Sequence, residues 1–187
     1  MTRHLKTLIV LSALATGLII MAAASQDSAP KRVGEAYPLS TCPVSGRPLG
    51  DKPVVVVLSE TPRSADKGRE VRFCCNGCRT TFEKDLNTNL PALDNKIIKA
   101  QMAYYPAGNC IVMDDEKMTD PRGEDAMKEK NVVIGNRLYR FCCKACIRKF
   151  KKNQKKYNEI LDAMVIKEQA PTYPLEVCVI SGCSYGA

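Results

Sequence analysis

The chain repeats one order of short apolar segments. A β-branched run at residues 54–58 predicts a strand. Residues 132–134, a Gly-Asn turn and the alternating residues 137–141 predict a β-hairpin, whose last strand has a counterpart at residues 69–73. Residues 114–131 are charged and lack an apolar period, so we expect a mobile loop there.

Helical periodicity follows each predicted hairpin. Residues 76–86 place Cys78, Phe82 and Leu86 on one face at steps of four, and the second copy repeats this spacing. Pro91 predicts the start of another helix. Its apolar stripe over residues 91–103 is Leu93, Ile97, Ile98 and Met102, and the equivalent stripe is Tyr157, Ile160, Leu161 and Met164. Strands followed by helices in each copy predict an α+β fold.

The cysteines show that these segments belong to a long repeat. Nine of the ten cysteines fall in one frame of 68 residues. Such a period indicates one structural unit copied along the chain. The first set is Cys42, Cys74, Cys75 and Cys78, the second is Cys110, Cys142, Cys143 and Cys146, and Cys178 begins a third. A Tyr-Pro pair precedes each lone cysteine, so we begin each repeat at that pair: module 1 covers residues 37–104, module 2 covers 105–172, and a partial third repeat covers 173–187. Before them we expect a signal peptide at residues 1–25 and a linker at 26–36.

The first 25 residues predict export. Arg3, His4 and Lys6 form a basic start, residues 8–24 are nearly all apolar, and this stretch ends in the small residues Ala22-Ala23-Ala24, which suit cleavage. The alternative is an uncleaved anchor, because the apolar stretch is close to the shortest that spans a bilayer. Either outcome places the cysteines outside the cytoplasm, in the periplasm or the secreted fraction, and the membrane is a partner only if the leader is uncleaved.

The charge and composition of the chain give no indication of a catalytic site. The formal charge is +8, and a basic run between Lys144 and Lys156 could contact nucleic acid or anionic lipid. Such a run is usually a solvated helix face, and export argues against nucleic acid as a partner. His4, the only histidine, lies in the leader, and we find no nucleophile–base set or phosphate loop. We therefore expect a protein that is not an enzyme.

Cysteine chemistry leaves three hypotheses. Four thiolates from a turn and a helix start suit tetrahedral Zn²⁺ or soft Cu⁺. Structural disulfides are favoured by export, but adjacent cysteines such as Cys74 and Cys75 cannot easily bridge each other and need separate partners. The sequence Cys75-Asn76-Gly77-Cys78 also resembles a redox motif, although no βαβ pattern surrounds it. For Cys178 and Cys183, a mutual disulfide is the simplest expectation.

The motif around the clusters resembles a known family. Module 1 and its copy are similar to heavy-metal-binding domains of the TRASH and YHS type, over residues 37–165. The resemblance is carried by Cys42-Pro43-Val44-Ser45-Gly46, by Arg72-Phe73-Cys74-Cys75-Asn76-Gly77-Cys78 with Phe82, and by Cys110, residues 139–143, Cys146 and Phe150. It implies two tandem treble-clef-like modules of zinc-ribbon type, each a hairpin plus helix.

The resemblance also implies ligands. By the family's pattern these are Cys42, Cys74 and Cys78 in one site and Cys110, Cys142 and Cys146 in the other. Many relatives carry a further cysteine where this chain has Ser45, Met113 and Ser181, so Cys75 and Cys143 are candidate replacements and Met113 a candidate thioether ligand. We expect an exported carrier, buffer or scavenger of zinc or copper, with a metal transporter or another envelope protein as candidate partner.

Overall fold

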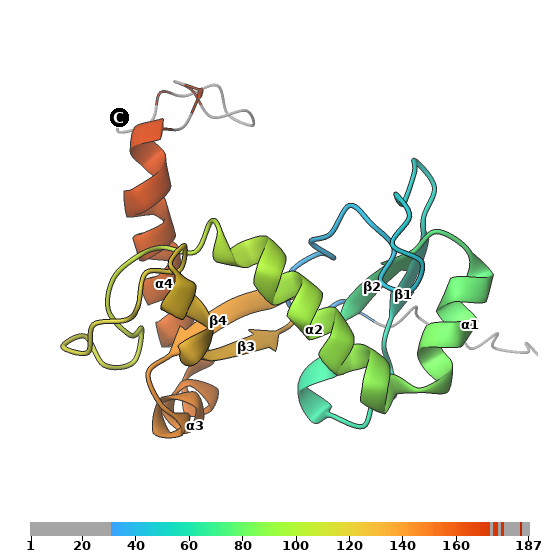
Figure 1. The fold of residues 1–187 in the computed structure, drawn as a ribbon, viewed down its shortest axis with the longest axis horizontal. Coiled ribbons are helices and arrows are strands. Elements are labelled where there is room, and N and C mark those ends of the chain that lie inside the picture. The colour runs from blue at the N-terminus through green and yellow to red at the C-terminus, as the bar shows by residue number, and fades with distance from the viewer. Residues whose placement is uncertain (1–30, 173, 176, 178–183, 185–187) are drawn as a thin grey trace, which may run out of the picture.

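The computed structural model describes residues 31–172, 174, 175, 177 and 184 (Figure 1). Within them the chain forms a mixed α+β fold of two small antiparallel sheets and four helices, as the sequence predicts. Each sheet is a two-stranded hairpin followed by two helices. The predicted signal peptide and most of the partial third repeat, including Cys178 and Cys183, lie outside the described residues.

The two hairpins differ in the length of their connection. Strand β1 (Val54–Val57) pairs with β2 (Glu70–Phe73), and β3 (Lys130–Ile134) pairs with β4 (Arg137–Phe141). A two-residue turn joins β3 to β4, whereas residues 58–69 join β1 to β2. The extra residues of the second copy lie before its first strand instead. The repeat frame therefore survives although the first strands do not occupy equivalent positions.

The helices form an angled pair after each hairpin. In order they are α1 (Asn76–Lys84), α2 (Leu86–Met102), α3 (Lys144–Lys152) and α4 (Gln154–Gln169). The prediction that Pro91 starts the second helix is wrong, because α2 contains Pro91 and begins five residues earlier. Its N-cap is Asp85, whose carboxylate accepts a hydrogen bond from Thr88 N–H at 3.1 Å. In copy 2, Asn153 has the same role for α4.

Aromatic pairs hold each cluster-bearing strand against its helix. Phe73 and Phe82 meet edge to face with ring centroids 5.3 Å apart, and Phe141 and Phe150 repeat the contact at 5.4 Å. All four rings are buried. Each Cys-Cys-x-x-Cys segment lies between the two members of such a pair in the sequence, so packing fixes the strand end relative to the helix start.

Helix α2 joins the two halves of the molecule. It lies across the middle of Figure 1 and packs against both β3 and β4. The Gln101 amide donates to the carbonyl of Asn136 at 2.8 Å and accepts from the N–H of Leu138 at 2.7 Å. Residues of the predicted linker add to this contact, because Val33 N–H donates to Gly68 and Glu35 N–H donates to Gly135, both at 2.7 Å.

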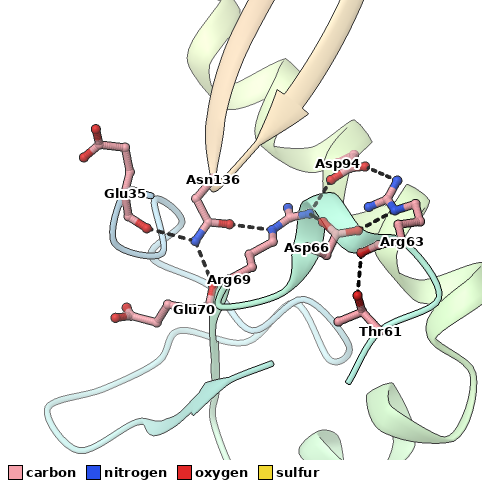
Figure 2. Close-up of polar contacts among 8 residues, drawn as sticks. All are labelled: Glu35, Thr61, Arg63, Asp66, Arg69, Glu70, Asp94 and Asn136. Atoms are coloured by element: carbon pink, nitrogen blue, oxygen red, sulfur yellow. Dashed lines mark hydrogen bonds and ion pairs between the residues drawn. The ribbon is translucent and has the colours of Figure 1, made fainter. Parts of the chain in front are cut away.

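A buried polar network lies where the modules meet (Figure 2). Arg69 is fully buried and donates to the carboxylates of Asp66 at 2.8 Å and Asp94 at 2.7 Å. Its Nε donates to Asn136, at the tip of the second hairpin. Because a buried guanidinium is costly unless it is paired, the network holds these segments in one arrangement.

The charged loop of the second copy is organised by one arginine. Arg140 is buried and donates to the carbonyl and hydroxyl oxygens of Thr119, to the carbonyl of Ala126 and to the amide oxygen of Asn131. A 3₁₀ turn spans Glu124–Lys128. We expected a loop over residues 114–131, but β3 already begins at Lys130, and the sequence pattern did not reveal these contacts because Arg140 lies on β4, outside the segment.

In the part of the chain that the structure describes, no helix combines the length and apolar character needed to cross a bilayer.

Candidate metal centre

The lone cysteine of module 1 is placed by a tight turn. Cys42 N–H donates to the carbonyl of Arg47 at 2.8 Å, and Gly46 N–H donates back to the carbonyl of Cys42 at 2.9 Å. Gly46 has φ of 72°, a left-handed conformation that favours glycine. The Tyr37 hydroxyl holds the start of the turn by donating to Thr41. Cys42 is completely buried, so its sulfur faces the interior.

The other sulfurs come from the end of β2 and the first turn of α1. Cys74 directly follows the strand, Cys75 is the N-cap of the helix, and Cys78 lies in the first helical turn. The Sγ atoms of Cys74 and Cys78 are 3.7 Å apart. The end of β2 and the first turn of α1 thus place the sulfurs of Cys74 and Cys78 close together.

The structure brings together the sulfurs that the family resemblance implies as ligands. The Sγ atoms of Cys42, Cys74 and Cys78 all lie within 4.8 Å of one another. We call this group cluster 1. Cys110, Cys142 and Cys146 meet the same criterion and form cluster 2, with 3.6 Å between the sulfurs of Cys142 and Cys146. Each cluster could hold a metal ion.

These separations match the geometry of a thiolate metal site. With Zn–S bonds of about 2.3 Å in a tetrahedron, two sulfurs lie about 3.8 Å apart along an edge. The contacts of 3.7 Å in cluster 1 and 3.6 Å in cluster 2 are close to that edge. Little rearrangement would be needed for these thiols to bind a common ion.

Local hydrogen bonds favour the thiolate of Cys42. Its burial disfavours the charged form, but the Ser45 hydroxyl and the N–H groups of Ser45, Cys74 and Val44 outweigh this effect and lower the pKa to about 6. Burial is the main cause that raises the pKa of Cys78 to about 12, with the neighbouring thiols adding to it. The thiol of Cys42 thus favours the thiolate form that binds a cation, whereas a cation that binds Cys78 would have to displace its proton.

Cluster 2 is the more deeply buried of the two. Cys110 and Cys146 are each 2% exposed. Burial, followed by the closeness of the Cys146 and Cys110 thiols, raises the pKa of Cys142. Burial likewise raises the pKa of Cys146 to about 11. Without a cation the thiols of Cys142 and Cys146 favour the protonated form.

Position 45 contributes a contact that sequence reasoning missed. We read Ser45 only as a missing cysteine, yet its hydroxyl lies 3.4 Å from the sulfur of Cys74. The equivalent Met113 instead contacts Lys149 Nζ through its thioether at 3.8 Å. The signal available in the sequence was the place of Ser45 in the turn, three residues after the buried ligand candidate.

Cys75 and Cys143 lie next to the clusters without belonging to them, and we call them the rim cysteines. Neither belongs to the groups that meet within 4.8 Å. The sulfurs of Cys74 and Cys75 are 3.9 Å apart, and those of Cys143 and Cys146 are 3.6 Å apart. The N–H of the helical cysteine three residues on, Cys78 or Cys146, lowers the pKa of each rim thiol. Their role as metal ligands stays a prediction.

Comparisons with known proteins found no similar sequence or fold. The chain matches no protein-family model, no curated protein and no solved structure. The function of the protein must therefore be inferred from the chemistry of its two clusters.

Proposed function

We propose that this protein is an exported binder of zinc or copper that acts as a carrier, buffer or scavenger through its cysteine thiolates. The observation that carries the proposal is the meeting of three sulfurs within 4.8 Å in each of two repeat-related clusters. Three thiols converging from a turn, a strand end and a helix start are hard to explain by packing alone, because free thiols gain little from one another's contact.

The donor set favours soft or borderline cations. Sulfur is the ligand type that selects Zn²⁺ and Cu⁺, whereas Ca²⁺ and Mg²⁺ prefer oxygen. We assign Cys42, Cys74 and Cys78 to one ion and Cys110, Cys142 and Cys146 to the other. Three protein ligands leave a fourth position of Zn²⁺ open to solvent or to a ligand of a partner protein. An open position suits a carrier, since a partner's ligand can bind before the protein's thiolates leave.

The resemblance to TRASH and YHS modules supports the same proposal. It accounts for the tandem arrangement and for the Phe-Cys-Cys-x-x-Cys segment that ends in each first helical turn. The leader motif is the basis for placing the protein outside the cytoplasm. A transporter or another envelope protein would then deliver or receive the ion.

Structural disulfides explain the clusters less well. The eight cysteines that the structure describes are all free. One disulfide joins only two of the three sulfurs of a cluster. A metal ion satisfies all three at once, and it would stabilise small modules that bury a modest core.

Metal and thiol analysis of one preparation tests the proposal. The full gene would be expressed with its leader in a Gram-negative host, and the protein purified from the periplasmic fraction without chelators. We expect about two zinc or copper ions per chain, from the two clusters. We also expect a mature N-terminus near residue 26. Protein without metal and without free thiols would replace the proposal by a disulfide framework, and an intact Met1 in the membrane fraction would contradict cleavage.

A further inference from the structure

The rim cysteines have no place in the proposed coordination. Cys75 is exposed, Cys143 is half-buried like the ligand candidates Cys74, Cys78 and Cys142, and Cys42, Cys110 and Cys146 are buried. When the three sulfurs of a cluster bind an ion, the neighbouring rim thiol, Cys75 or Cys143, is not coordinated to it. It is therefore the thiol that an external reagent reaches first.

In module 2 the rim thiol lies beside a metal-ligand candidate that it can bridge, and Cys75 and Cys78 have the same spacing of three residues in module 1. In module 2 the sulfur of Cys143 is 3.6 Å from that of Cys146. A disulfide joins sulfurs about 2.05 Å apart, so closure needs a shift of roughly 1.5 Å, which side-chain rotation can supply. The spacing of three residues at a helix start is one that forms disulfides, whereas the adjacent cysteine, Cys142 or Cys74, is too close along the backbone.

We propose that Cys75 and Cys143 are attacking thiols for a thiol–disulfide exchange that releases the bound ion. The co-reactant is a low-molecular-weight disulfide, which an oxidising compartment supplies. The inference rests on the proposed metal sites and adds a route by which the ion leaves. It also gives the doubled cysteine of each cluster a function that three-sulfur coordination alone does not.

The exchange proceeds in two displacements. The thiolate of Cys75 attacks one sulfur of the small disulfide, forms a mixed disulfide with it, and expels the other half as a thiolate. The bond between the ion and Cys78 then breaks, and the freed sulfur attacks Cys75 and expels the second half. The small disulfide gains two electrons, and the protein pair loses two. Cluster 1 keeps only Cys42 and Cys74, and the ion dissociates. Cys143 and Cys146 act in the same way in cluster 2.

The test uses the full mature chain loaded with zinc and treated with oxidised glutathione. The parent protein for this test carries Cys178→Ser and Cys183→Ser, so that those thiols do not react, and every variant is made in this parent. A chromogenic chelator follows zinc release, and peptide mass mapping locates the new disulfides. In the double variant Cys75→Ser with Cys143→Ser, we expect both zinc ions to bind and their release to slow by at least about tenfold. The matched control, Asn76→Ser with Ala145→Ser, changes exposed neighbours and should release zinc at the rate of the parent.

The outcomes separate this inference from the proposed function. A parent chain that takes up no zinc would remove the proposed function, and the release mechanism with it. If the parent binds two ions and the rim variant loses them, Cys75 and Cys143 are ligands and the inference is overturned. Release from the rim variant at the parent's rate, or a first disulfide between Cys74 and Cys78, would overturn it as well.

Discussion

Arg69 Nε donates a hydrogen bond of 2.7 Å to Oδ1 of Asn136, although the two residues belong to different copies of the repeat. Both side chains are completely buried. The amide of Asn136 also donates to the carbonyl oxygens of Glu70 at 2.8 Å and Glu35 at 3.2 Å. One asparagine thus satisfies buried groups of the linker, of β2 and of the arginine network, so the two clusters are held by one connected structure.

Replacing Asn136 by glycine should destabilise the whole molecule. Glycine tolerates the positive φ of 68° found there, so the backbone is preserved while the side-chain bonds are lost. Because Arg69 would keep a buried donor without its partner, we expect a loss of roughly 2–3 kcal/mol in the free energy of unfolding. Urea denaturation measures it. Asn76→Gly, at an exposed helix start, should stay within about 0.5 kcal/mol; equal losses in both variants would contradict the interpretation.

Glu70 should make stability depend on pH. Its carboxylate is nearly buried, yet hydrogen bonds from Tyr37 N–H, Arg72 and Arg32 outweigh burial and lower its pKa. A carboxyl whose pKa is lower in the folded state stabilises it above the unfolded pKa of about 4.3, and this contribution is lost as pH falls through the folded pKa. The stability difference between the native protein and Glu70→Gln should therefore be largest near neutral pH and shrink below about pH 4.

Thermal unfolding at a series of pH values measures this difference. Glu83→Gln is the control, because Glu83 forms only an exposed pair with Arg79 on α1. A difference for Glu70→Gln that is the same at every pH would show that the carboxylate charge contributes nothing.

Local pattern predicted much of the fold and most of the geometry of the clusters. The apolar spacing of residues 76–86 predicted a helix, which the structure has as α1 over Asn76–Lys84 with Phe82 buried. The frame of 68 residues identified the two sets of cysteines, and the family resemblance implied which three sulfurs of each set meet. These features depend on neighbours along the chain or on the repeat itself. The start of α2 was missed because Pro91 was taken as the first residue of the helix and the capping carboxylate of Asp85 was not considered.

The features that sequence reasoning missed depend on distant residues. Arg140 organises a loop that carries no pattern of its own, and Arg69 pairs with Asn136 across 67 positions. No sequence pattern reveals a hydrogen bond of this kind, because it forms only when the two modules pack together, with α2 against the second hairpin. The hydroxyl contact of Ser45 was missed for a similar reason, since the sulfur that it meets comes from a different element.

Metal content should fall by one ion for each cluster that is broken. Cys78→Ser removes a ligand from cluster 1 and Cys146→Ser one from cluster 2, and a site short of one of three ligands loses most of its affinity. We expect about one ion per chain in each single variant and none in the double variant, measured by elemental analysis after dialysis. Two ions retained by a single variant would mean that Cys75 or Cys143 had taken over as ligand.

The phasing of the repeat gives the last prediction. The step from Cys146 to Cys178 equals that from Cys78 to Cys110, so the sequence alone permits each cluster to use the lone cysteine that follows it. In the structure Cys110 meets Cys142 and Cys146, the cluster that comes after it. The Tyr-Pro turn and the hairpin lead directly into that cluster. Loop length favours neither phasing, because Cys110 to Cys142 and Cys146 to Cys178 both span 32 positions. We therefore expect Cys178→Ser to keep both ions and Cys110→Ser to lose one. Loss of an ion from Cys178→Ser would reverse the phasing and make Cys178 a ligand.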